Sequence, residues 1–130
     1  MISNSLATEV PDIKNLFINK ELKKYDGLTF LDDKNNVLNL DNYKGNLILL
    51  NFWATWCAPC KEEMPSLDLL QTNDAFDNLK IFPINVGRDN LEKSNEFFKD
   101  LKIKNLNVYF DSPNTLAKKF GLRGVPTSIL

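Results

Sequence analysis

Hydrophobic residues fall into blocks along the chain, some with the character of strands and others with helical spacing. Residues 47–53 are almost continuously apolar, which is typical of a strand buried on both faces in a mostly parallel sheet. Shorter apolar runs predict strands over residues 80–86, 108–110 and 127–130. Two further runs around a turn-rich cluster predict a β-hairpin over residues 28–40.

Apolar residues recur at helical spacing in the remaining blocks. This spacing predicts helices over residues 11–24, 58–71, 90–102 and 113–120. Pro11 suits the first turn of the first of these helices, and lysines crowd its C-terminal end. Helices that alternate with strands predict an α/β fold. We expect an N-terminal extension over residues 1–27, which carries the first helix, and one domain over residues 28–130.

Composition narrows the classes of function. The chain has 130 residues, of which 43% are hydrophobic and 25% are charged, as in an ordinary globular domain. Its formal charge of −1, with no dense basic patch, argues against a nucleic-acid partner. The chain contains no histidine, which removes Cys–His and Ser–His–Asp catalysis and the commonest metal ligand.

The two ends of the chain bear on location and completeness. The first ten residues have neither a basic start nor an apolar core, so they do not predict a signal peptide, and no apolar run approaches the ~18 residues of a membrane span. The sequence is therefore that of either a cytoplasmic protein or an exported protein without its leader or anchor. Because the chain stops at Leu130, inside a predicted strand, we expect a shortened form of the domain.

The two cysteines, Cys57 and Cys60, are the chemically distinctive residues of the chain. The predicted buried strand ends at Trp53, and the next helix begins near Cys57. A helix N-terminus favours an anion, and such sites lower a cysteine pKa from ~8.5 to as little as ~3.5–7.5. Cys60 lies one turn later on the same side of the helix. It is therefore placed to attack a mixed disulfide formed at Cys57 and to release the partner.

Other interpretations of the cysteine pair are weaker. Zinc usually needs four protein ligands, or three and a water, and no further Cys or His is present to supply them. Copper favours softer or additional ligands, and the nearby Met64 suits a core position. A structural disulfide over so short a loop would add little stability. Thiol–disulfide exchange is therefore favoured, with a copper-carrying metallochaperone and a non-catalytic binding domain as alternatives.

Two segments of the sequence resemble a known family. Residues 51–65 read NFWATWCAPCKEEMP, and residues 124–128 read GVPTS. The first resembles the active-site segment of the TlpA/ResA family of thioredoxin-like proteins, and the second resembles that family's cis-proline loop. The match covers residues 28–130 and leans toward TlpA. It implies a thioredoxin-like fold that lacks its last strand and C-terminal helix, and therefore a bare sheet edge through which copies could self-associate.

The resemblance also assigns a role to Glu63, which matches the family's active-site glutamate. A partly desolvated carboxylate near the thiols would have a raised pKa and could carry a proton during exchange. Thioredoxin has a buried aspartate in the strand before its cysteines, where this chain has Asn51, a residue that cannot titrate. The alternative is that Glu63 is a solvated helix residue beside Glu62.

The remaining site residues are those expected to contact a client protein. The resemblance implies that they are Trp56, Ala58, Pro59, Val125 and Pro126. Pro126 should follow a cis peptide bond and face the cysteines, so that the Val125 backbone pairs with an extended client segment. The alternative for Pro126 is an ordinary turn proline. Trp53 should be part of the core.

The resemblance finally implies a biological setting. It implies no cofactor beyond the redox-active disulfide and no metal, with protein disulfides as clients and an upstream thiol donor as partner. The direction it implies is reduction of client cysteines for copper insertion into cytochrome oxidase or for cytochrome c biogenesis. It further implies a periplasmic location and a membrane-anchored natural form.

Overall fold

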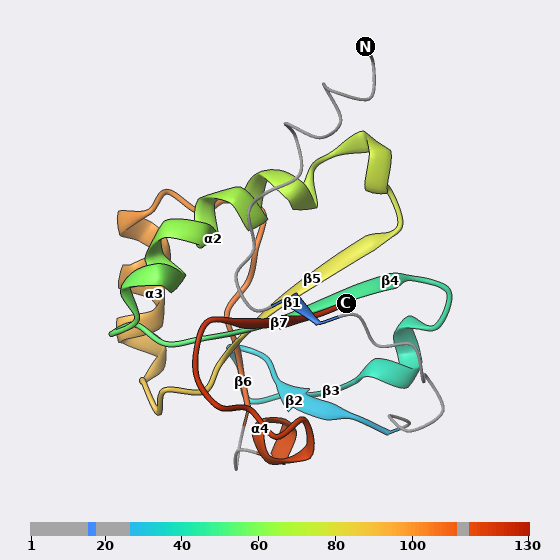
Figure 1. Cartoon of the computed structure of the whole chain (residues 1–130), viewed down its shortest axis with the longest axis horizontal. Coiled ribbons are helices and arrows are strands. Elements are labelled where there is room, and N and C mark those ends of the chain that lie inside the picture. The colour runs from blue at the N-terminus through green and yellow to red at the C-terminus, as the bar shows by residue number, and fades with distance from the viewer. Residues whose placement is uncertain (1–15, 18–26, 112–114) are drawn as a thin grey trace.

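The computed structural model describes residues 16–17, 27–111 and 115–130, which form a seven-stranded sheet with helices on both faces (Figure 1). The strands are β1 Leu16–Phe17, β2 Thr29–Leu31, β3 Val37–Asn39, β4 Leu47–Trp53, β5 Leu79–Asn85, β6 Tyr109–Phe110 and β7 Thr127–Ile129. The helices are α2 Ala58–Gln71, α3 Leu91–Asp100 and α4 Thr115–Lys119, with 3₁₀ turns at Leu40–Tyr43 and Asp74–Phe76.

The sheet has the strand order β1-β7-β4-β5-β6-β2-β3 and is mixed. β4 runs parallel to β5 along its whole length, and β5 runs parallel to β6. β7 is antiparallel to β4, and β2 is antiparallel to both β3 and β6. The loops after β4, after β5 and before β7 therefore meet at one end of the sheet, and this end carries the cysteines.

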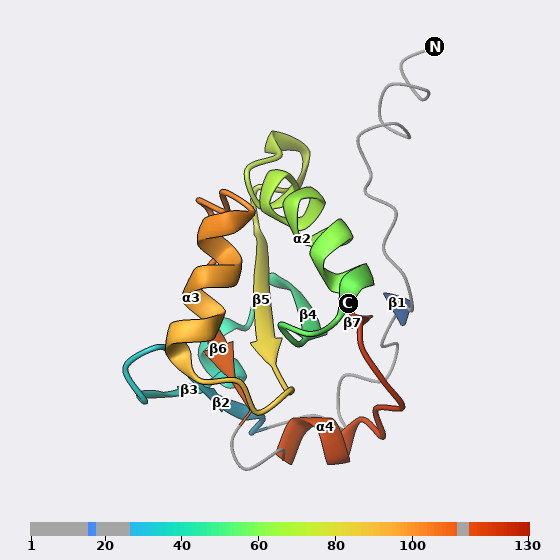
Figure 2. The same cartoon turned by 90° about the vertical axis from the view of Figure 1, so that its left-hand side faces the viewer.

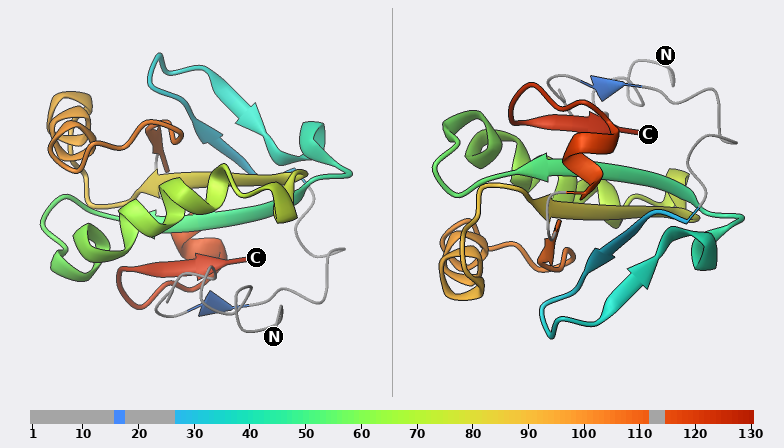
Figure 3. Two further views of the ribbon diagram at one scale, coloured as in Figure 1. Left: turned by 90° about the horizontal axis from the view of Figure 1, so that it is seen from above. Right: turned by 90° about the horizontal axis from the view of Figure 1, so that it is seen from below.

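The two faces of the sheet have separate cores. Alternate residues of β4 point to opposite faces, so Leu49 and Trp53 pack with the buried side chains of α2 and α3, whereas Leu50 and Phe52 pack with α4. Figure 2 shows α2 and α3 on the same side of the sheet, and Figure 3 shows α4 on the opposite face. This division confirms the prediction that β4 is buried on both sides.

Helix α2 has the bounds that the sequence predicts. Cys57 is its N-cap, and Pro59 lies in the first turn, where a missing N–H costs no helical hydrogen bond. Pro65 lies inside the helix without ending it, and the helix continues to Gln71. Met64 and Leu67 are fully buried against the sheet, so α2 is firmly packed behind the cysteines.

The prediction of a helix over residues 11–24 is wrong at Leu16 and Phe17. These two residues form β1, which pairs in parallel with Ser128 and Ile129 of β7. The backbone of β7 would otherwise present unpaired N–H and C=O groups at its outer edge, and a short extended segment satisfies them better than a helix can. The expected bare edge of β7 is therefore wrong at these positions. The rest of the predicted helix lies outside the described residues.

Candidate active site

Cys57 and Cys60 form a disulfide at the start of α2, with their Cα atoms 5.3 Å apart. The backbone N–H of Cys60 donates to Cys57 Sγ over 3.2 Å, which makes the sulfur itself the cap of the helix. The same N–H, together with the helix dipole, would stabilise a thiolate at Cys57 after reduction. Cys57 is 5% exposed and Cys60 is 0% exposed, so the first sulfur is the one nearer to a partner.

A tight turn leads from β4 into the disulfide. Cys57 N–H donates to the carbonyl of Ala54 over 3.2 Å, which closes a four-residue β-turn over residues 54–57. Trp56, within this turn, is 69% exposed beside Cys57. Trp53, just before it, is fully buried and stacks on Phe98 with ring centroids 5.3 Å apart. The predicted core position of Trp53 is therefore confirmed, and contact of the exposed Trp56 with a client stays a prediction.

Glu63 lies inside the protein and not on a solvated face. It is 5% exposed, whereas the adjacent Glu62 is exposed. Asn51 Nδ2 donates to Glu63 Oε1 over 2.8 Å and also to Ser128 Oγ over 2.9 Å, so one amide of β4 joins α2 to β7. Among the described residues, Asn51 Oδ1 has no hydrogen-bond partner. The predicted burial of Glu63 is therefore confirmed, and its part in proton transfer stays a prediction.

The loop before β7 packs against the disulfide region. The Val125–Pro126 peptide bond is cis, as the resemblance predicts. Val125 packs against the core cluster that includes both cysteines, and Pro126 is buried. Thr127 Oγ1 donates to the carbonyl of Gly124 over 2.7 Å, which fixes the loop just before the strand. Ala58, on the other side, is exposed in the first turn of α2.

Sequence reasoning missed two residues beside the site. Asp89 Oδ2 accepts hydrogen bonds from the Thr55 N–H over 2.8 Å and from Asn85 Nδ2 over 3.0 Å. Burial alone raises the pKa of the Asp89 carboxyl, but the hydrogen bonds from Thr55 and Asn85 outweigh it, so the pKa lies below its ordinary value of 3.8. The only available signal was Asn85, a polar residue at the end of an apolar strand.

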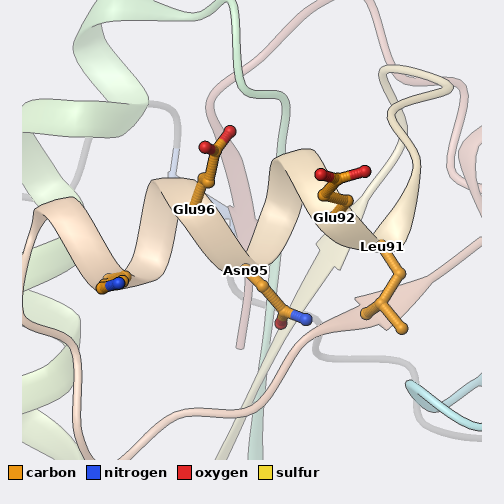
Figure 4. Close-up of a pocket in the computed structure, with 5 residues that line it drawn as sticks. Leu91, Glu92, Asn95 and Glu96 are labelled. Carbon is orange, nitrogen blue, oxygen red and sulfur yellow. The ribbon is translucent and has the colours of Figure 1, made fainter.

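Other features of the described residues lie apart from the disulfide. No group of three or more His, Cys, Asp or Glu side chains in these parts of the chain could hold a metal ion. No helix in the same parts is long and apolar enough to cross a membrane. A shallow hollow on α3 is lined by side chains of that helix alone, with no residue of the disulfide region among them (Figure 4). These residues are Leu91, Glu92, Asn95, Glu96 and Lys99.

A disulfide in the first turn of a helix, packed on a mixed sheet beside a cis-proline loop, defines the thioredoxin-like class of folds. The chain belongs to the AhpC/TSA family, whose model matches residues 11–129. The thiol-disulfide oxidoreductase ResA of Bacillus thuringiensis is 31% identical over 93 residues, which are 72% of this chain and 53% of that protein. The thiol:disulfide interchange protein DsbE of Vibrio cholerae is 27% identical over 130 residues, 100% of this chain and 67% of that protein.

A solved structure supports the same class. The pneumococcal exposed lipoprotein thioredoxin Etrx1 of Streptococcus pneumoniae matches with a TM-score of 0.63 and 27% identity, over 78% of this chain and 77% of that chain. The predicted thioredoxin-like fold and the predicted resemblance to ResA-type proteins are thus confirmed, and the narrower likeness to TlpA stays a prediction. The chain spans about half the length of the ResA protein it matches.

Proposed function

We propose that the protein is a thiol–disulfide oxidoreductase that exchanges two electrons with protein disulfides through Cys57 and Cys60. One observation supports this most directly: the two sulfurs are within bonding distance at a helix N-terminus, and of the two cysteines only Cys57 keeps any exposed surface. Thiol–disulfide exchange needs one accessible nucleophile and one protected resolving thiol. The pair has this asymmetry.

The proposed reduction of a client proceeds in two balanced steps. The Cys57 thiolate attacks one sulfur of the client disulfide, forms a mixed disulfide and expels the other client sulfur as a thiolate. The Cys60 thiolate then attacks Cys57 Sγ, closes the intramolecular disulfide and expels the second client thiolate. Two electrons pass from the cysteine pair to the client, and an upstream thiol donor must return two electrons before the next cycle.

Glu63 is proposed to exchange the protons of these steps. Cys60 is fully buried, so its thiol can lose its proton only to a group inside the protein or to a water that enters. Two carboxyl side chains of the same helix are buried, Glu63 and Asp68. Asp68 accepts the backbone N–H groups of Lys104 and Asn105, whereas Glu63 lies one turn after Cys60 and is the carboxyl proposed to take the proton. Asn51 fixes the orientation of Glu63 through the hydrogen bond to Oε1. Direct proton transfer is therefore assigned to Glu63, and Asn51 positions it.

The client is proposed to be an extended protein segment that docks across Trp56, Ala58, Pro59, Val125 and Pro126. The exposed indole of Trp56 offers apolar contact area, and the Val125 backbone offers strand-like hydrogen bonds. Clients that take part in copper insertion into cytochrome oxidase or in cytochrome c biogenesis, and reduction as the direction, rest on the resemblance alone. A location outside the cytoplasm, with a membrane-anchored natural form, is consistent with the exposed lipoprotein among its structural relatives.

Trapping of the mixed disulfide tests the proposal. In the Cys60→Ser variant the second step is blocked, so reduced protein mixed with oxidised insulin should form a covalent adduct that dithiothreitol releases. The matched Cys57→Ser variant keeps one cysteine but should form far less adduct, because its remaining sulfur is buried. Equal adduct from both variants, or adduct from neither, would contradict the assignment of Cys57 as nucleophile.

A further inference from the structure

The loop between β5 and α3, residues 86–90, contacts the turn that carries the nucleophile. Val86 N–H donates to the carbonyl of Trp53 over 2.9 Å, so the loop begins against the end of β4. Three residues later the Asp89 carboxylate receives the N–H of Thr55, two residues before Cys57. The loop therefore contacts the first half of the turn of residues 54–57, and the second half of the turn continues into α2.

Asp89 is itself held in place by a chain of polar groups. Asn85 Nδ2 donates to Asp89 Oδ2 over 3.0 Å and lies 3.3 Å from Ser94 Oγ on α3. Asn85 Oδ1 accepts the N–H of Gly87 over 2.9 Å. Asn85 and Ser94 are both buried, so these hydrogen bonds connect a rigid helix and a central strand to the carboxylate.

Gly87 allows the loop to approach the turn closely. A Cβ atom at this position would lie 2.5 Å from Ala54 Cβ and 2.9 Å from Trp56 Nε1. The first neighbour is attached directly to the backbone and cannot rotate away. Any larger residue would therefore push the turn, and with it the exposed indole, from its place.

We propose that Asp89 is a positioning residue, with Gly87 as its steric counterpart, that fixes the turn of residues 54–57 and so sets the placement of Cys57 and Trp56. The inference rests on the proposed function, because it concerns how the same site meets a client. A nucleophile displaced by about 1 Å can lose on the order of 10²-fold in rate. Through the hydrogen bond from the Thr55 N–H, the loop holds the backbone of this turn two residues before the reacting cysteine.

Substitutions at Asp89 test the proposal against a matched control. Asp89→Leu removes the acceptor, whereas Asp89→Asn keeps an oxygen that can accept from both Thr55 and Asn85. Asp32→Leu is the control, because Asp32 Oδ1 also accepts two loop N–H groups at 2.8 Å but lies in the β2–β3 turn, three strands away from β4. The rate of insulin reduction is measured with each variant fully reduced, without urea and at a pH where all the variants are folded.

We expect Asp89→Leu to lower the rate constant by about tenfold, Asp89→Asn to stay within about twofold of the natural chain, and Asp32→Leu to leave it unchanged. Amide hydrogen exchange at Thr55 should accelerate in Asp89→Leu alone. A natural rate in Asp89→Leu, or an unchanged Thr55 exchange rate, would overturn the proposal.

Two further measurements keep the outcomes distinct. If Asp89→Leu does not fold, Gly87→Ala replaces it. We expect the same loss of rate and a shift of the Trp56 indole N–H resonance. An unmoved resonance together with a natural rate would overturn the proposal. If the natural chain does not reduce insulin at all, the proposed function fails. The Thr55 exchange rates would then still show whether Asp89 anchors the turn.

Discussion

The two faces of β4 differ in what they bury. Toward α4 the strand presents Leu50 and Phe52, which join an aromatic cluster in which Phe82 lies 5.1 Å from Phe30 and 5.2 Å from Tyr109, measured between ring centroids. Toward α2 it presents Asn51 between Leu49 and Trp53, next to a buried carboxylate and a disulfide. The first face is an ordinary apolar core. The second face carries buried polar groups, which cost free energy on folding.

This difference between the two faces of β4 assigns stability mainly to the α4 face and chemistry to the α2 face. Burying Glu63 and leaving Asn51 Oδ1 unpaired both cost stability, and neither improves packing. Such groups persist where they serve a reaction. Substitutions on the α4 face should therefore change the free energy of unfolding, and substitutions on the α2 face should change rates.

Cys57→Ser should produce the largest effect, the complete loss of insulin reduction. The hydroxyl of serine is not ionised at neutral pH and cannot replace the thiolate nucleophile. Insulin turbidity measures the activity. Urea unfolding of both reduced proteins provides the control, since Cys57 is part of the buried core and a loss of folded protein must be separated from a loss of chemistry. Retained activity would show that another group is the nucleophile.

Phe82→Ala should have the next largest effect, on stability alone. Removing a buried phenylalanine ring generally costs about 3–5 kcal/mol, and Phe82 has three aromatic neighbours within the cluster on the α4 face. Urea unfolding measures the loss. The folded fraction should reduce insulin at the natural rate. A loss of activity greater than the loss of folded protein would contradict the claim that the α4 face contributes to stability and not to the reaction.

Glu63→Gln should lower the rate of exchange by about 10²-fold, the low end of the range for general acid–base catalysis, equivalent to about 2.7 kcal/mol. Glutamine keeps the shape and can still accept the hydrogen bond from Asn51, so stability should change much less than in Phe82→Ala. The pH profile of the rate should lose one titration. An unchanged profile would remove Glu63 from the proton transfer.

Asp89→Asn should have the smallest effect, and the size of that effect depends on pH. The native pKa of Asp89 lies below 3.8, so the ionised carboxylate stabilises the fold at neutral pH. Asparagine loses about 1 kcal/mol of this charge-assisted hydrogen bonding. The stability difference between the two proteins should shrink as the pH falls from above 3.8 through the native pKa, which urea unfolding at several pH values measures. A difference that grows on acidification would contradict this account.

Much of the fold follows from local pattern. The apolar run of β4, the Asn90 cap of α3 and the positions of Cys57 and Pro126 are visible in the sequence because each depends on neighbouring residues. The local pattern does not decide which of Glu62 and Glu63 is buried, since adjacent glutamates on one helix differ only in which side meets the sheet.

The features that sequence reasoning missed depend on distant pairing. Leu16 and Phe17 suit a helix or a strand equally well, and the edge of β7 decides between them. Asp89 resembles an ordinary loop residue before a helix cap, and only its approach to Thr55, 34 positions earlier, reveals its contact. Local propensity contains no information on such long-range contacts.

The central claim, that the α2 face is a redox site, is tested most directly by the equilibrium of the Cys57–Cys60 disulfide with glutathione, followed by tryptophan fluorescence. Trp53 and Trp56 flank the site and provide the signal. The account predicts one reversible two-electron transition with a midpoint nearer to thioredoxin's (about −270 mV) than to the strongly oxidising end of the known range near −120 mV. A midpoint near that oxidising end would reverse the proposed direction. The absence of any reversible transition would contradict the account.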